Sequence, residues 1–217
     1  VLEPNVHNIA VEGSFDDCQD LVKAMFNDAA FRDSMNLSAV NSINWARIMA
    51  QIAYYIAAGV ALGAPERRFT FAVPTGNFGN VFAGYAARRM GLPIDKLVVG
   101  SNANDILTRF LETGTMKMGQ VVPTLSPSMD IQVSSNFERL LFLALGRNGK
   151  AVGKLMEGFR ASGEFRLPAR PLKAIRSLFE GRRLDDAATK AAIKGLHRLT
   201  GHILDPHSAI GVASGLE

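Results

Sequence analysis

The chain has 217 residues, of which 47% are hydrophobic and 20% are charged, the composition of an ordinary soluble protein. Its formal net charge of +4 is mild, and no run of lysine and arginine is dense enough to indicate a nucleic-acid partner. The length allows one domain, or a large domain with a small one.

The single cysteine, Cys18, excludes an internal disulfide and a cysteine-based metal site, and it favours a reducing, cytoplasmic location. The longest apolar run, Ile48 to Leu62, is interrupted by Gln51 and is too short to cross a bilayer. Residues 1–11 lack the basic region and long apolar run of a signal peptide. From these two features we expect no membrane partner. The four histidines show no metal-ligand spacing, so we expect no metal either.

Residues 1–40 are predicted to form a βα unit at the end of a smaller α/β domain. Val6–Val11 has the pattern of a short strand, and Ser14–Asp17 resembles a capping box that opens a helix. The acidic residues Asp16 and Asp17 would then lie in the first helical turn, where the helix dipole favours negative charge. We prefer this structural role to a catalytic one.

Asn41 and Ser42 are good cap residues for the next predicted helix. Its apolar face comprises Trp45, Ile48, Met49, Ile52, Ile56 and Val60. Asn44, Arg47 and Gln51 share a second, polar face. Amide and hydroxyl donors near a helix N-terminus, with a guanidinium one turn on, can hold a phosphate. The residues alone favour the simpler interpretation, a capped helix with a solvated polar stripe.

A glycine-bearing turn follows the predicted strand Phe69–Val73 and precedes the predicted helix Val81–Met90. Its glycines let the backbone approach an anion closely, and N–H groups at a helix N-terminus attract phosphate. The candidate anion-binding residues are Gly76, Asn77, Phe78, Gly79 and Asn80. The residues alone fit a phosphate site and a ligand-free tight turn about equally well.

The pattern of strand, turn and helix recurs at Lys96–Gly100, Ser101–Asp105 and Ile106–Glu112. It predicts an α/β fold with a parallel sheet and helices on both faces, in which ligands bind at the carboxyl ends of the strands. We expect residues 41–217 to form this large domain, with a helical insertion over about 135–199. Within the insertion, helices are expected near 151–161, 172–180 and 186–199. Asp205 is expected to cap a last helix.

Four stretches resemble threonine synthase, a pyridoxal-phosphate (PLP) enzyme of fold type II. They are, in the family's order, Val11–Asp17, Asn41–Arg47, Pro74–Asn80 and Asp205–Ala209. One such motif would be weak evidence, whereas four in order are specific. The resemblance implies the fold-type-II architecture, with residues 41–217 as the PLP-binding domain.

The resemblance also implies a reaction and a set of site residues. Threonine synthases convert O-phospho-L-homoserine and water to L-threonine and phosphate. By this resemblance, Gly76, Asn77, Phe78, Gly79 and Asn80 would bind the PLP phosphate. The phosphate of O-phosphohomoserine would be held by Asn41, Ser42, Asn44 and Arg47.

The family's Schiff-base lysine has no counterpart here, because no lysine of this chain stands in the family's lysine context. We therefore expect the catalytic lysine outside these residues, and the pyridine partner likewise. The first residue is valine, and the chain stops at Glu217 without a terminating element, so we expect a fragment that is inactive alone.

Two alternatives remain open. A related PLP-dependent phospholyase or dehydratase would share the fold, but a dehydratase acting on an unphosphorylated amino acid would not need the second anion site at Asn41–Arg47. A non-catalytic module that binds a phosphometabolite would lack the upstream lysine altogether. The sequence predicts no oligomeric state.

Overall fold

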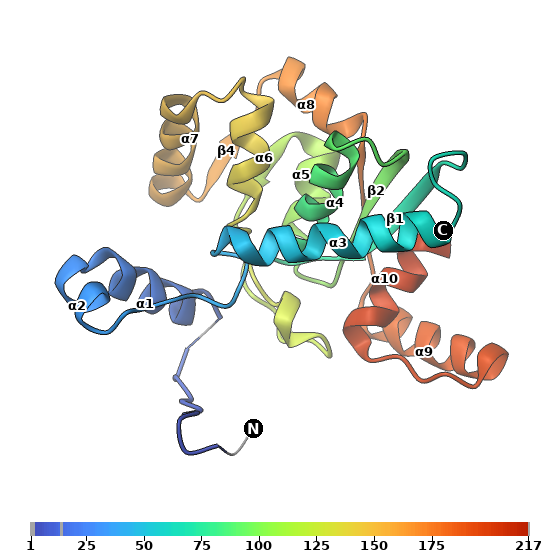
Figure 1. The fold of residues 1–217 in the computed structure, drawn as a ribbon, viewed down its shortest axis with the longest axis horizontal. Helices are drawn as coiled ribbons and strands as arrows, with labels where there is room; N and C mark the ends of the chain where they lie inside the picture. Colours follow the sequence, from blue (N-terminus) through green and yellow to red (C-terminus); the bar gives the residue numbers. More distant parts are fainter. Residues whose placement is uncertain (1–2, 14, 217) are drawn as a thin grey trace. The chain divides into compact units, whose positions relative to one another are not determined.

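The computed structural model describes residues 3–13 and 15–216. The chain divides into two compact units, Val1–Ser38 and Ala39–Glu217. The first contains helices α1 (Phe15–Asn27) and α2 (Ala29–Ser34), and the second contains all the strands of the described chain (Figure 1). Every residue proposed as a ligand-binding residue falls in the second unit.

The strand predicted at Val6–Val11 is wrong. These residues have no regular structure, and the Ile9 side chain is 84% exposed. No other strand is present in the described part of this unit to pair with them, so the alternating pattern has no hydrogen-bond partner to order it. Asp16 and Asp17 do lie in the first turn of α1, as predicted. The predicted cap residue Ser14 lies outside the described residues.

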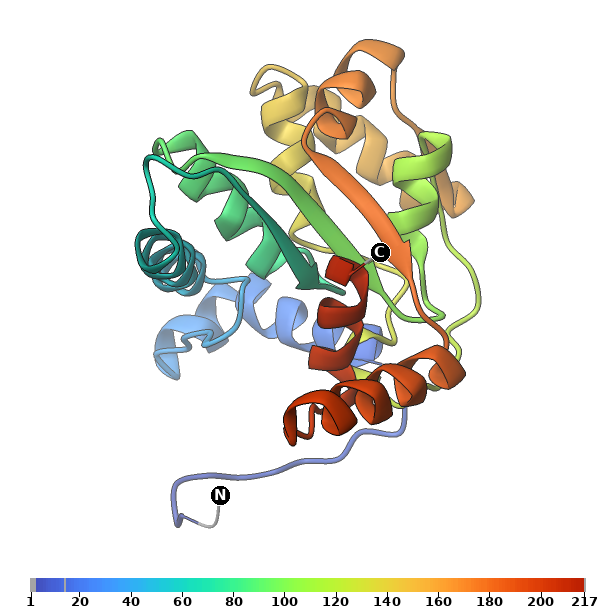
Figure 2. The same cartoon turned by 90° about the vertical axis from the view of Figure 1, so that its right-hand side faces the viewer.

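The second unit is built on a parallel sheet of three strands in the order β1-β2-β5. The first two, β1 (Phe69–Pro74) and β2 (Ile94–Ser101), confirm the predicted buried strands. The third, β5 (Phe179–Arg183), pairs with the carboxyl half of β2. Figure 2 shows the three strands side by side with helix α10 (Pro206–Leu216, red) lying against them.

Helices cover both faces of the sheet, as predicted. A side chain at Gly84 of α4 (Gly79–Arg89) would meet Leu97 of β2, whereas one at Gly100, three residues on in β2, would meet α10. Because side chains alternate along a strand, these two positions face opposite sides. Helix α5 (Ile106–Thr113) contacts β2 and packs on β5, where Gly181 leaves no room for a side chain beside Thr108.

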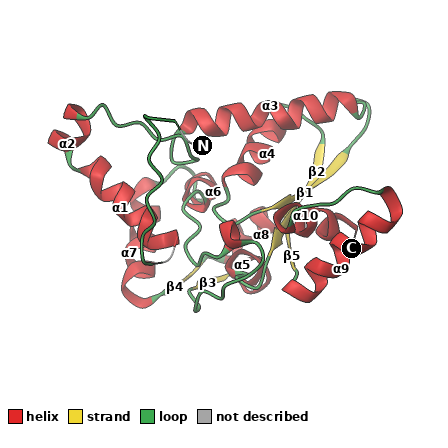
Figure 3. Ribbon diagram, turned by 90° about the horizontal axis from the view of Figure 1, so that it is seen from below, coloured by secondary structure: helices red, strands yellow, loops and turns green. Residues whose placement is uncertain are grey.

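Helix α3 (Trp45–Ala61) packs beside α4 (Figure 3). Its inward face differs from the predicted one: Ile48 is buried, but Trp45, Met49 and Val60 are 44%, 53% and 62% exposed. The other buried positions are Gln51, Tyr55 and Gly59. The reason is the close approach of the Tyr55 ring to Gly84, which orients the helix. No helix in the described residues has the length and apolar content needed to span a membrane.

The segment predicted as helical, residues 135–199, contains two strands as well. Its helices are α6 (Phe137–Ala144), α7 (Gly149–Ser162), α8 (Ala169–Arg176) and α9 (Asp186–Thr200). Strand β4 (Glu164–Arg166) pairs antiparallel with β3 (Thr115–Lys117). The helix predicted to run to Glu180 ends instead at Arg176, because the residues after it extend and pair with β2 as β5.

Replacing Gly211 by alanine should destabilise the protein by about 1–3 kcal/mol, because the new Cβ would lie 2.6 Å from the Pro74 ring of β1. The matched control is Gly195→Ala in α9, where a Cβ would meet nothing within 4 Å. That substitution should be neutral or stabilise by up to about 1 kcal/mol. Urea unfolding measures both, and equal effects of the two substitutions would contradict the packing of α10 on β1.

Candidate anion-binding site

The turn after β1 is shaped by Phe78. This residue adopts the left-handed conformation (φ 64°), which is unusual for a residue with a side chain. Its ring is 1% exposed and packs edge-on against Phe137, with ring centroids 5.0 Å apart, and at 5.4 Å from Phe179. The buried aromatic contacts hold the strained backbone in place. The Phe78 side chain therefore belongs to the core, and only its backbone can face a ligand.

The backbone carbonyls and N–H groups of the turn differ in their partners. The carbonyl of Gly76 accepts a hydrogen bond from Ser134 Oγ (2.8 Å), and that of Asn77 accepts one from the Asn136 N–H (3.1 Å). By contrast, none of the backbone N–H groups of Gly76–Val81 donates a hydrogen bond to another described residue. These donors lie at the N-terminus of α4, whose N-cap, Phe78, offers no side-chain acceptor. The turn is thus a set of uncapped donors at the positive end of a helix.

Two glycines bring other segments to this turn. A Cβ at Gly76 would lie 3.2–3.3 Å from atoms of Ser128, Met129 and Ile131. A Cβ at Gly79 would lie 2.3 Å from Ser42 Oγ. Both positions therefore need the small volume of glycine. The contact between Gly79 and Ser42 brings together the two candidate phosphate-binding segments, because Ser42 comes from the segment before α3.

Within that segment, two of the predicted amide side chains already make hydrogen bonds inside the protein. Asn41 Oδ1 accepts a hydrogen bond from the Ile43 N–H (3.0 Å). Asn44 caps α3, since its Oδ1 accepts from the Ala46 N–H (3.0 Å) while its Nδ2 donates to the Ala39 carbonyl (2.9 Å). The cap of α3 is therefore Asn44, not Asn41 or Ser42.

Arg47 lies in the first turn of α3, and its side chain is exposed. Among the described residues it forms no ion pair and no side-chain hydrogen bond. The guanidinium is thus available to a ligand. The third member of the predicted polar stripe, Gln51, is buried instead, at 6% exposure, so the stripe is not a solvated face.

Arg139 of α6, which sequence patterns did not single out, holds the segment before α3. Its Nη2 donates to the carbonyls of Ser42 (3.3 Å) and Ile43 (3.2 Å), and its guanidinium lies 5.5 Å from the centroid of the Trp45 ring. Burial lowers the pKa of Arg139. The contact spans about a hundred positions along the chain, so no local spacing could have predicted it.

Asn80 is divided between two roles. Its backbone N–H belongs to the uncapped set, but its side-chain Oδ1 accepts a hydrogen bond from the Tyr55 hydroxyl (2.6 Å). Burial raises the pKa of Tyr55, so this hydroxyl keeps its proton and remains a donor. The side chain of Asn80 therefore joins α4 to α3.

The predicted last cap is also present. Asp205 Oδ1 accepts a hydrogen bond from the Ser208 N–H (3.0 Å), and Ser208 is the main cause of the lowered pKa of this carboxyl. His207 Nδ1 lies 3.2 Å from Ser128 Oγ, and burial lowers the pKa of His207. Since Ser128 also adjoins Gly76, three of the four matched stretches meet around the turn.

The chain is similar to known proteins over its whole length. The whole chain is 54% identical over 217 residues to a threonine synthase of Pseudomonas aeruginosa and covers 46% of its length. A threonine synthase of Saccharomyces cerevisiae is 41% identical over 230 residues, covering 99% of this chain and 45% of that protein. The chain spans about half the length of the curated relatives it matches. No family model matches the chain.

Among solved structures, the PLP-bound threonine synthase from Brucella melitensis superposes with a TM-score of 0.89 at 57% identity. The match covers 98% of this chain and 46% of that one. Maize serine racemase, at 15% identity and a TM-score of 0.58, shares the fold alone over 98% of this chain and 53% of its own. The predicted architecture, that of fold-type-II PLP enzymes, is confirmed.

The contact between Gly79 and Ser42 is testable by a double substitution. Gly79→Ala should destabilise the protein by about 1–3 kcal/mol, because its Cβ would overlap Ser42 Oγ and Cβ. Adding Ser42→Gly removes both overlapping atoms and should restore part of the loss. Chemical unfolding gives the two free energies, with Gly153→Ala, where a Cβ meets nothing within 4 Å, as the control. Strictly additive losses would show that the two residues do not touch.

Proposed function

We propose, because the chain is a homologue of the threonine synthases along its whole length, that the protein converts O-phospho-L-homoserine and water to L-threonine and phosphate. We further propose that it does so in the cytosol with PLP as cofactor. The observation that carries the proposal is the meeting of two candidate phosphate-binding segments, residues 41–47 and 74–80, where Ser42 adjoins Gly79.

The residues of the turn fit the phosphate of PLP. The N–H groups of Gly76–Val81 have no acceptor among the described residues, and a helix N-terminus suits a dianion. Gly76 and Gly79 let residues 128–131 and Ser42 pack directly against the turn. We propose that Gly76, Asn77, Phe78, Gly79 and Asn80 hold this phosphate through their backbone amides. When bound, PLP supplies an electron sink that stabilises negative charge on the substrate carbons.

The substrate phosphate is proposed to lie near Ser42 and Arg47. Ser42 Oγ makes no hydrogen bond to a described residue, and the Arg47 guanidinium is exposed and unpaired among them. A guanidinium fork matches a phosphate with two parallel hydrogen bonds. Asn41 and Asn44 shape the segment through the bonds they already make, and each amide retains a further N–H for the anion.

This second site distinguishes the proposal from a dehydratase of the same fold. An unphosphorylated amino acid offers a guanidinium only its α-carboxylate, whereas a phosphorylated one offers a second anionic group. An enzyme that holds PLP while it expels phosphate from a phosphorylated amino acid and adds water would need both anion sites at once. The free Arg47 therefore favours a phosphorylated substrate.

In the full-length protein, Arg47→Ala should lower kcat/KM for O-phosphohomoserine about 10- to 100-fold, the loss expected for one or two charge-assisted hydrogen bonds. The amount of bound PLP should not change, because the turn at Gly76 is untouched. The control is Arg160→Ala, which removes an exposed arginine of α7. Unchanged kinetics in Arg47→Ala would exclude a phosphate at this residue.

A further inference from the structure

An irregular segment lies behind the candidate phosphate site. We name residues 118–134, between β3 and α6, the backing loop; its one regular element is the 3₁₀ turn η1 (Pro127–Met129). Ser128 O and Met129 Cα would each lie 3.3 Å from a Cβ at Gly76, and Ile131 Cδ1 would lie 3.2 Å from it. At the end of the loop, Ser134 Oγ donates to the Gly76 carbonyl (2.8 Å). The loop thus fixes where Gly76 lies.

The loop pairs with no strand to hold this position. Its Met129 and Ile131 side chains are buried, at 1% and 0% exposure, and polar side chains attach the loop as well. At its centre, the Asp130 carboxylate accepts four hydrogen bonds. Oδ1 accepts from Asn102 Nδ2 (2.7 Å), Asn104 Nδ2 (2.9 Å) and Thr124 Oγ1 (2.7 Å), and Oδ2 accepts from the Thr124 N–H (2.8 Å). Asp130 stands between Met129 and Ile131, the two residues whose atoms adjoin Gly76.

The asparagines that donate to Asp130 come from the turn after β2, so they attach the loop to the sheet. Asn102 and Asn104 are 2% and 5% exposed. Asn104 also pairs twice with the backbone of Val122, donating to its carbonyl and accepting from its N–H, both at 2.8 Å. Buried amides of this kind need partners, and a carboxylate that accepts from several donors satisfies them together.

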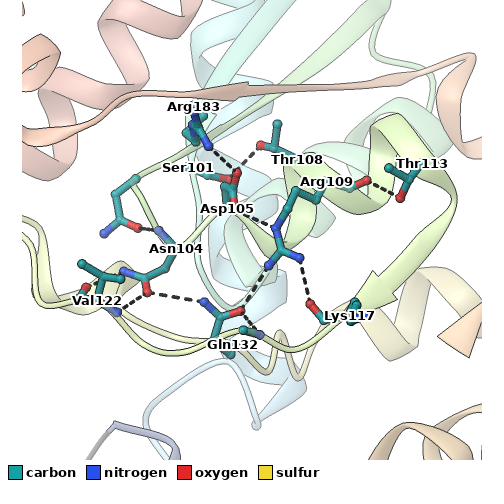
Figure 4. Close-up of polar contacts among 12 residues, drawn as sticks. Ser101, Asn104, Asp105, Thr108, Arg109, Thr113, Lys117, Val122, Gln132 and Arg183 are labelled. Atoms are coloured by element: carbon teal, nitrogen blue, oxygen red, sulfur yellow. Dashed lines mark hydrogen bonds and ion pairs between the residues drawn. The ribbon is translucent and has the colours of Figure 1, made fainter. Parts of the chain in front are cut away.

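The two ends of the loop are joined by Arg109 of α5 (Figure 4). Its Nη1 donates to the Lys117 carbonyl (3.0 Å), just before the loop, and its Nη2 lies 3.4 Å from Gln132 Oε1, near the end of the loop. Its Nε donates to Asp105 Oδ1 (2.8 Å), and Arg183 pairs with the other oxygen of that carboxylate (3.1 Å). The loop is therefore closed at its ends and attached at its middle.

We propose that Asp130 is a positioning residue of the phosphate site. Its carboxylate holds the backing loop against Gly76, and the loop in turn fixes the orientation of the uncapped N–H groups of Gly76–Val81. This inference rests on the proposed function, because it takes that turn as the site of a phosphate. It assigns no contact between Asp130 and the anion.

The direction in which Asp130→Asn changes the affinity for phosphate distinguishes a positioning role from a purely electrostatic one. Asp130→Asn keeps the shape but removes a negative charge near an anion site, which by Coulomb's law alone would strengthen phosphate binding. It also places an NH₂ group against a donor that Asp130 now accepts from, which weakens the attachment of the loop. Positioning thus predicts weaker binding, and charge alone predicts tighter binding.

The experiment uses the full-length protein freed of PLP, with inorganic phosphate as the probe, in an Arg47→Ala background so that the binding measured is that of the turn. In Asp130→Asn, the dissociation constant of phosphate should rise about tenfold, an effect of the size that ligand-orienting partners have at other sites. The N–H groups of Asn136 and Phe82, which donate to the turn carbonyls of Asn77 and Phe78, should also exchange with solvent faster. Thr124→Val, which removes one donor and keeps the charge of Asp130, should act in the same direction with smaller size and serves if Asp130→Asn does not fold.

The control is Asp95→Asn, which removes an exposed carboxylate paired with Arg68 at the opposite end of β2 and should change neither quantity. Unchanged or tighter phosphate binding in Asp130→Asn, or unchanged exchange at the Asn136 and Phe82 amides, would overturn the positioning role. Absence of phosphate binding by the PLP-free protein with Asp130 intact would instead refute the proposed function, while the exchange rates would still decide whether Asp130 holds the turn.

Discussion

The structure around the candidate site depends on one constraint, the left-handed backbone of Phe78. Holding a residue with a side chain at φ 64° costs about 1–3 kcal/mol, and the burial of its ring against Phe137 and Phe179 offsets that cost. The consequence is a turn whose carbonyls face the protein while its amides are left uncapped. Burial of the Phe78 ring in the core thus stabilises a turn whose N–H groups have no acceptor within the described protein.

Three contacts from other segments of the second unit hold that turn in place. Ser42 adjoins it at Gly79, the backing loop adjoins it at Gly76, and Tyr55 ties Asn80 to α3. These contacts join segments far apart along the chain. The hydrophobic core fixes the strands and helices. The irregular segments between them have a few buried apolar side chains, such as Met129 and Ile131, and are also held by hydrogen bonds to asparagine, aspartate and arginine side chains. Loss of a polar partner should therefore affect the site more than it affects the sheet.

Local patterns predicted much of this unit. The strands β1 and β2 and the helices α4 and α5 follow from short buried runs that end at glycine, proline and asparagine. The strand β5 could not be predicted in this way, because Phe-Glu-Gly-Arg-Arg has neither an apolar run nor alternation. Its pairing with β2 makes it a strand. Likewise the turn at Gly76–Asn80 could be predicted, since its signal lies within seven residues. The roles of Arg139 and Asp130 could not, because their partners are distant in sequence and only the fold brings them together.

A crystal structure of the full-length protein with phosphate or PLP tests the central claim most directly, that the uncapped amides after β1 form a phosphate site. The account predicts an ordered phosphate group within hydrogen-bond distance of several N–H groups of Gly76–Val81, with Phe78 still left-handed and buried. A structure in which those amides donate to protein groups, with the phosphate bound elsewhere, would contradict it.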